Sequence, residues 1–218
     1  MKKIQIYFMP GLGANPKIFE HISLPKDQFE IHLLEWKIPV SEDESIQDYA
    51  QRMANEIKHQ NPVLLGVSFG GVLVQEIAKI IAVKKIILVS SIKSHHEFPN
   101  RLKLLQKTKA YKFFPTRIIE NFDKYKKYFL GDFLKKRADL YTLYLSVNDS
   151  LYLKWAIYTL LHWQQDKIPE NILHIHGNND HVFPSKHIHN FTQINNGSHV
   201  MILLKANEIS TIIYRNLT

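Results

Sequence analysis

The segment 66–70 (GVSFG) carries the clearest chemical signal in the sequence. It follows an apolar run, residues 62–67 (PVLLGV), and precedes a stretch with helical spacing. A serine flanked by two glycines in a strand–turn–helix context is typical of a nucleophile held on a tight turn. Glycine is needed two positions to either side, because larger side chains would collide with the neighbouring backbone. We therefore predict that Ser68 is a nucleophile at the N-terminus of a helix, which favours developing negative charge.

A serine hydroxyl needs an adjacent base before it attacks a carbonyl, and His199 is the predicted base. His199 follows a short predicted strand, 191–194, and so lies at the carboxyl end of a strand, where sites form in parallel sheets. Asp180 leaves the predicted strand 171–175 in a polar loop, from which it could fix the tautomer of His199. The alternatives are a surface loop histidine and an Asx-turn aspartate. Asp149 is a second candidate acid.

Backbone N–H groups must also meet the charge that develops on the carbonyl oxygen. The first predicted donor is Phe69, the residue after the nucleophile. The second should come from the loop after the first strand, residues 9–13 (MPGLG), where we choose Leu12 and keep its neighbour Gly11 as the alternative. Ser68, Asp180 and His199 with these two amides would form a complete acyl-transfer site.

The elements that must position these residues alternate along the chain. We predict strands at 3–8, 29–36, 62–67, 85–89, 171–175 and 191–194, and helices at 45–58, 70–82 and 202–214. The first helix has Ser41 or Ser45 as its cap. This alternation predicts an α/β fold, with a mostly parallel sheet and helices on both faces. The pattern stops between 93 and 169, so we expect a core of residues 1–92 and 170–218 and a helical cap at 93–169. Trp155 and Trp163 should pack the cap against the core.

Taken together, these segments resemble the α/β-hydrolase family along most of the chain. The resemblance rests on the loop 10–13 (PGLG), the elbow 66–70, the acid loop 177–180 with Pro184 beyond it, and the ending 197–199 (GSH). It implies that Ser68 is the nucleophile, Asp180 the acid and His199 the base, with the insertion as a lid. Many members have His-Gly where this chain has Pro10-Gly11, and Gly-Gly-His where it has 197–199. With one strand before the oxyanion loop, we expect a compact version without the usual leading antiparallel hairpin.

Composition restricts the other possibilities. The absence of cysteine excludes a disulfide framework, a zinc–thiolate site and a cysteine nucleophile. We see no transmembrane segment and no export signal, so we expect a cytoplasmic protein. The formal net charge is +8, and residues 101–137 hold twelve Lys or Arg against three acidic residues. Aromatic residues alternate with these lysines, which fits an amphipathic lid better than a nucleic-acid or membrane surface. A basic lid could attract anionic acyl substrates.

Other constellations are weaker. Gly11 and Gly13 after a strand resemble a dinucleotide fingerprint, but Pro16 stands where its third glycine belongs, and no phosphate-binding loop is present. The histidine pairs 174/176 and 187/189 lack a third ligand nearby, so we expect no metal and no cofactor. The predicted function is hydrolysis of an ester or thioester of a small-molecule acyl substrate. The competing class is a non-catalytic binding protein on the same scaffold, because fold does not dictate function.

Overall fold

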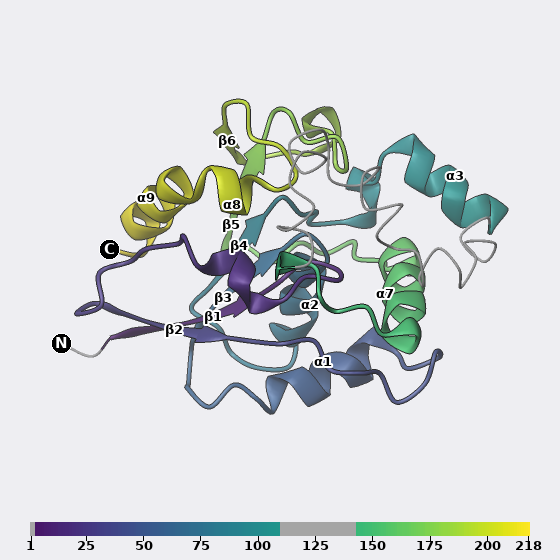
Figure 1. The fold of residues 1–218 in the computed structure, drawn as a ribbon, viewed down its shortest axis with the longest axis horizontal. Helices are drawn as coiled ribbons and strands as arrows, with labels where there is room; N and C mark the ends of the chain where they lie inside the picture. Colours follow the sequence, from purple (N-terminus) through teal and green to yellow (C-terminus); the bar gives the residue numbers. More distant parts are fainter. Residues whose placement is uncertain (1–2, 110–142) are drawn as a thin grey trace.

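Six parallel strands form one sheet in the computed structural model, which describes residues 3–109 and 143–218 (Figure 1). The strands are β1 (Ile4–Met9), β2 (Phe29–Leu33), β3 (Val63–Val67), β4 (Lys85–Val89), β5 (Ile172–Gly177) and β6 (Thr192–Ile194). Their order across the sheet is β2-β1-β3-β4-β5-β6, and each neighbouring pair is parallel. All six predicted strands are therefore present, and no antiparallel hairpin occurs among the described residues. The predicted fold class is confirmed.

Helices cover both faces of the sheet and bury its alternating side chains in two cores (Figure 1). In β1, Tyr7 and Met9 face one core while Ile6 and Phe8 face the other, because successive strand residues point to opposite faces. The first core includes α1 (Ile46–Ala54), α2 (Phe69–Ile77) and α7 (Ser150–His162). The second includes the 3-10 helix η1 (Pro16–Phe19), α8 (Met201–Leu204) and α9 (Ala206–Leu217).

The helix ends refine the sequence-based boundaries. Ser45, not Ser41, caps α1, and its hydroxyl accepts a hydrogen bond from the Asp48 amide at 3.0 Å. The prediction of one helix over 202–214 is wrong, because the chain leaves helical geometry at Lys205 and forms α8 and α9. Met201 and Ile209, on either side of this break, are both fully buried in the second core. Apolar spacing alone does not reveal such a bend, since no glycine or proline marks it.

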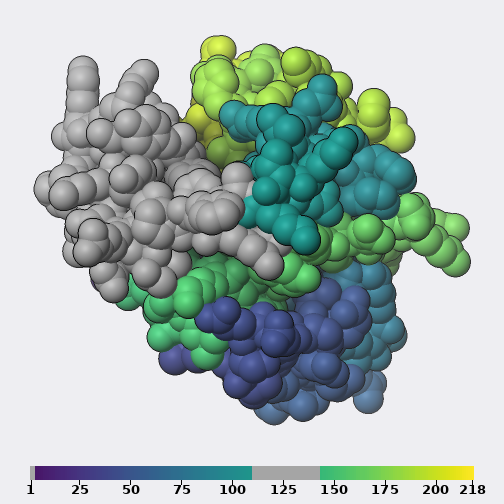
Figure 2. All heavy atoms as spheres, turned by 90° about the vertical axis from the view of Figure 1, so that its right-hand side faces the viewer, coloured from purple at the N-terminus to yellow at the C-terminus, as the bar shows by residue number. Residues whose placement is uncertain are grey.

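Two helices of the predicted cap, α3 (Asn100–Thr108) and α7, lie on one side of the molecule, where Figure 2 shows α3 in teal beside the yellow-green C-terminal segments. Trp155 is fully buried and donates from its indole to the Glu44 carbonyl at 2.8 Å. Trp163 donates to Glu76 of α2 at 2.7 Å. Both tryptophans of the predicted cap thus contact residues of the predicted core. Residues 110–142, which carry most of the predicted basic segment, lie outside the described residues, and the division into core and cap stays a prediction.

None of the helices in the described ranges has the length and apolar character that crossing a bilayer requires.

Candidate active site

Ser68 occupies the sharp turn between β3 and α2. Its φ of 52° and ψ of −120° are strained for a residue with a side chain. The turn closes tightly, since a Cβ added at Gly66 would lie 2.3 Å from the Gly70 carbonyl oxygen. Behind it, the Ser91 hydroxyl donates to the Ser68 carbonyl at 2.7 Å, and the Ser68 amide donates to Val89 at 3.0 Å. The surrounding backbone therefore holds Ser68 in the conformation expected of a nucleophile elbow.

The structure brings Ser68, His199 and Asp180 together at the carboxyl edge of the sheet. His199 Nε2 lies 3.0 Å from Ser68 Oγ, and His199 Nδ1 lies 2.9 Å from Asp180 Oδ2. Asp180 follows β5 and His199 follows β6, two adjacent parallel strands. Their loops touch closely, since a Cβ at Gly177 would lie 2.1 Å from the carbonyl oxygen of Gly197. The three side chains thus form the hydrogen-bonded series Ser–His–Asp that a serine nucleophile requires.

The Asp180 carboxylate is buried and fully partnered. Its Oδ1 accepts hydrogen bonds from the amides of Val182 and Phe183 at 2.7 and 2.9 Å, while Oδ2 faces His199. Burial acts to raise the pKa of this carboxyl, but the charge and hydrogen bond of His199 prevail and hold the pKa below its ordinary value. Asp180 is therefore ionised at neutral pH and able to stabilise a protonated His199.

A histidine for which the sequence predicts no role supports the acid loop. His176 is fully buried on β5, and its Nε2 donates to the Phe183 carbonyl at 2.8 Å while lying 3.6 Å from Asp180 Oδ2. Burial lowers the pKa of His176, and burial together with His176 lowers that of His174 further, so both are neutral. His176 thus braces the loop that presents Asp180. Its place on a buried strand, two residues before the polar loop 178–180, is a signal that could have suggested a position beneath this loop.

Asp149, the second candidate acid, forms no hydrogen bond or ion pair with His199, whose carboxylate partner is Asp180. The Asp149 side chain caps α7 by accepting the Tyr152 amide at 2.9 Å. This aspartate has the N-cap role that its residue type favours.

The loop predicted to supply the oxyanion donors lies against Ser68, the predicted nucleophile. A Cβ added at Gly11 would be 3.4 Å from Ser68 Cβ, so Leu12 comes from the backbone next to Ser68. Phe69 is the first residue of α2, where backbone N–H groups have no partner within the helix. In the described part of the chain, neither the Leu12 amide nor the Phe69 amide has a hydrogen-bond acceptor. Phe69 and Leu12 therefore stay the predicted oxyanion donors.

Aromatic side chains that the sequence did not single out surround this loop. Trp36 stacks on Phe69 with ring centroids 5.1 Å apart and planes 8° from parallel, and it lies 5.3 Å from the Tyr152 ring. The Trp36 indole donates to the Gly11 carbonyl at 2.9 Å, and the Tyr152 hydroxyl accepts the Gly13 amide at 3.3 Å. Trp36 ends the predicted strand 29–36, and that position at the carboxyl edge could have suggested proximity to the site.

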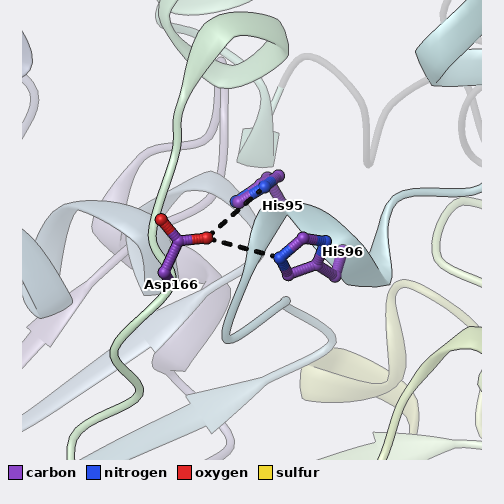
Figure 3. Close-up of side chains that lie close together, drawn as sticks. All are labelled: His95, His96 and Asp166. Atoms are coloured by element: carbon purple, nitrogen blue, oxygen red, sulfur yellow. Dashed lines mark ion pairs between the residues drawn. The ribbon is translucent and has the colours of Figure 1, made fainter.

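Figure 3 shows a second cluster of polar side chains, formed by His95, His96 and Asp166. Asp166 Oδ1 lies 3.8 Å from His95 Nε2 and 3.3 Å from His96 Nε2. Among the described residues, these three are the group whose possible ligand atoms lie close enough together to suggest a metal site. His95 Nδ1, however, accepts the Gln165 amide at 3.2 Å, which places the proton of the neutral ring on Nε2, facing Asp166. An Nε2–H group donates and does not ligate. We interpret the cluster as a set of polar contacts that joins the two ends of the predicted cap.

No protein-family model and no curated protein sequence matches the chain. Solved structures do match it over nearly its whole length. BpoC from Mycobacterium tuberculosis H37Rv superposes with a TM-score of 0.75 at 12% identity, covering 99% of this chain and 92% of that protein. A bromoperoxidase from Bacillus anthracis gives 0.70 at 14% identity, with coverage of 99% and 92%. A thermophilic esterase from Thermogutta terrifontis gives 0.67 at 13% identity, with coverage of 99% and 90%.

The chain has the α/β-hydrolase fold. In α/β-hydrolases the nucleophile, acid and base follow one another in the order Ser, Asp/Glu, His, and Ser68, Asp180 and His199 have that order. At such low identity the likeness establishes the fold alone, and the matched proteins include a bromoperoxidase as well as an esterase. Any reaction must therefore be argued from the side chains of this chain itself.

Proposed function

We propose that this protein is a serine hydrolase that cleaves a carboxylic ester or thioester through an acyl-enzyme intermediate. The observation that carries the proposal is the continuous series of short contacts from Asp180 through His199 to Ser68, at 2.9 and 3.0 Å. A serine, a histidine and an ionised aspartate in this arrangement are what nucleophilic acyl transfer needs.

In the first half-reaction, His199 Nε2 takes the proton from Ser68 Oγ as this oxygen attacks the carbonyl carbon. Asp180 keeps the His199 proton on Nδ1 and stabilises the imidazolium. The amides of Phe69 and Leu12 donate to the oxyanion of the tetrahedral intermediate. His199 then returns its proton to the leaving alcohol or thiol, and the acyl group remains on Ser68.

In the second half-reaction, water attacks the acyl group of Ser68, and His199 Nε2 accepts the proton of that water. The second tetrahedral intermediate collapses as His199 returns this proton to Ser68 Oγ, and the carboxylic acid is released. Ser68, His199 and Asp180 with the two amides therefore account for every proton transfer and bond change in both half-reactions.

The test is turnover of a p-nitrophenyl ester by the wild type, by Ser68→Ala and by Ser198→Ala. The Ser68→Ala variant should lose essentially all turnover, because the nucleophile is gone, while its circular dichroism and Tm remain those of the wild type. Ser198 is the matched control, since its buried hydroxyl neighbours His199 but has no hydrogen-bond partner among the described residues. Turnover by Ser68→Ala at the wild-type rate would refute the proposal.

A further inference from the structure

The carbonyl oxygen of Gly11 accepts two hydrogen bonds, one from within its own turn and one from the segment after β2. The Ala14 amide donates to it at 3.0 Å and closes the turn 11–14, in which Gly13 adopts a φ of 71° that suits glycine. The Trp36 indole Nε1–H donates to the same oxygen at 2.9 Å. The first bond is local to the turn, whereas the second ties the turn to the segment that follows β2.

The Gly11 carbonyl belongs to the same peptide group as the Leu12 N–H. In a trans peptide these two groups lie in one plane and point in opposite directions, and the described residues contain no cis peptide. Fixing the Gly11 oxygen towards Trp36 and Ala14 therefore fixes the Leu12 N–H away from them. Since Gly11 lies against Ser68, the direction of this amide decides whether it can serve a substrate oxygen there.

We propose that Trp36 is a positioning residue that aims the Leu12 N–H at the oxyanion formed on a carbonyl attacked by Ser68. The inference rests on the proposed function. A hydrogen bond accepted by a peptide carbonyl also polarises the group and makes its N–H a better donor. Trp36 thus acts on the transition state through the Gly11–Leu12 peptide without touching the reacting atoms.

The indole is itself held in place, which a positioning role requires. Its ring lies parallel to that of Phe69, whose backbone N–H is the other proposed oxyanion donor, and against the buried Tyr152 of α7. Tyr152 also accepts the Gly13 amide at 3.3 Å, so the same aromatic group contacts the far end of the turn. One rigid cluster therefore braces the backbone that carries both donors.

The experiment removes the indole N–H and leaves the aromatic packing. Trp36→Phe and the isostere Trp36→3-benzothienylalanine, which replaces only the ring N–H by sulfur, are compared with Trp163→Phe. Trp163 is the matched control because its buried indole N–H bonds to Glu76, outside the site. Each variant is assayed for kcat and KM on the p-nitrophenyl ester. Each is also assayed for inhibition by a trifluoromethyl ketone, which forms a tetrahedral oxyanion adduct, and by the product carboxylic acid.

Both Trp36 variants should lower kcat about tenfold with KM within twofold, a smaller loss than the 10²–10³-fold found when an oxyanion donor is deleted. The Ki of the ketone should rise by the factor lost in kcat/KM, the Ki of the product acid should not change, and Trp163→Phe should turn over like the wild type. Full kcat in the benzothienylalanine variant, or a loss confined to KM, would overturn the inference. If Trp36→Phe does not fold, the isostere alone decides the outcome. If Ser68→Ala is inactive and the Trp36 variants are fully active, only this inference is refuted. If Ser68→Ala is active, the proposed function is refuted.

Discussion

Replacing Asp180 by asparagine tests whether its carboxylate directs the proton on His199. In the folded protein Asp180 Oδ2 accepts from His199 Nδ1 at 2.9 Å, while Oδ1 accepts two loop amides. Asparagine preserves the shape, and its oxygen can keep the two amide bonds. Its NH₂ group would then face His199 Nδ1 and donate to it, which moves the imidazole proton to Nε2. That proton would point at Ser68 Oγ, 3.0 Å away, and His199 could no longer act as the base.

The expected loss follows from this change of tautomer. Reversing the tautomer in a Ser–His–Asp triad costs about 10⁴-fold in kcat. At 1.36 kcal/mol per factor of ten, this corresponds to roughly 5.5 kcal/mol of transition-state stabilisation. KM should change little, because Asp180 is buried behind His199.

The assay is steady-state hydrolysis of the p-nitrophenyl ester by the wild type, Asp180→Asn and Asp149→Asn. Asp149 is the matched control, since its carboxylate also accepts a backbone amide, at the start of α7, and asparagine is an equally good N-cap. Asp149→Asn should retain wild-type kcat. The reasoning is wrong if Asp180→Asn, shown to be folded by its Tm, keeps kcat within tenfold of the wild type.

Two further predictions concern the loops around the triad and the histidines beneath it. Gly177→Ala should lower kcat at least tenfold and destabilise the fold by about 1–3 kcal/mol. The new Cβ would lie 2.1 Å from the Gly197 carbonyl oxygen and would push the loops of Asp180 and His199 apart. Urea unfolding measures the stability and ester turnover measures kcat, and wild-type values of both would contradict this prediction. The free energy of unfolding should be constant above about pH 6.5 and fall below it, because the buried His174 and His176 stay neutral in the fold and take up protons on unfolding. For His174, whose pKa lies well below its ordinary value, the free energy of unfolding should fall by about 1.4 kcal/mol per pH unit, and His176 should add to this fall. Urea midpoints that do not differ between pH 7.5 and 5.5 would contradict the prediction.

The sheet and the three side chains of the candidate site, Ser68, Asp180 and His199, could be predicted from the sequence because each has a local sequence pattern. A buried strand such as β3 is a short apolar run, and a serine between glycines directly after it has few other structural explanations. Asp180 and His199 can be predicted for the same reason, since each lies in the loop after a strand whose carboxyl end must lie at one edge of the sheet. Local pattern and tertiary arrangement agree at these positions.

Contacts between distant segments could not be predicted in this way. The bond from Trp36 to Gly11 joins residues 25 positions apart, and nothing in either segment specifies it. The sequence places His176 just before the acid loop, but it does not specify the hydrogen bond to the Phe183 carbonyl. The bend at Lys205 is likewise set by packing of Met201 and Ile209 in one core, which apolar spacing describes equally well as a single helix.

The central claim is that Ser68 is a nucleophile activated by His199, and covalent labelling tests it most directly. The intact protein, Ser68→Ala and His199→Ala are incubated with a fluorophosphonate, and the modified residue is located by mass spectrometry of the digested chain. The wild type should carry a single adduct on Ser68, Ser68→Ala should carry none, and His199→Ala should react at least a hundredfold more slowly, in line with the contribution of a general base. A folded wild type that is not labelled, or a label on another residue, would contradict the account.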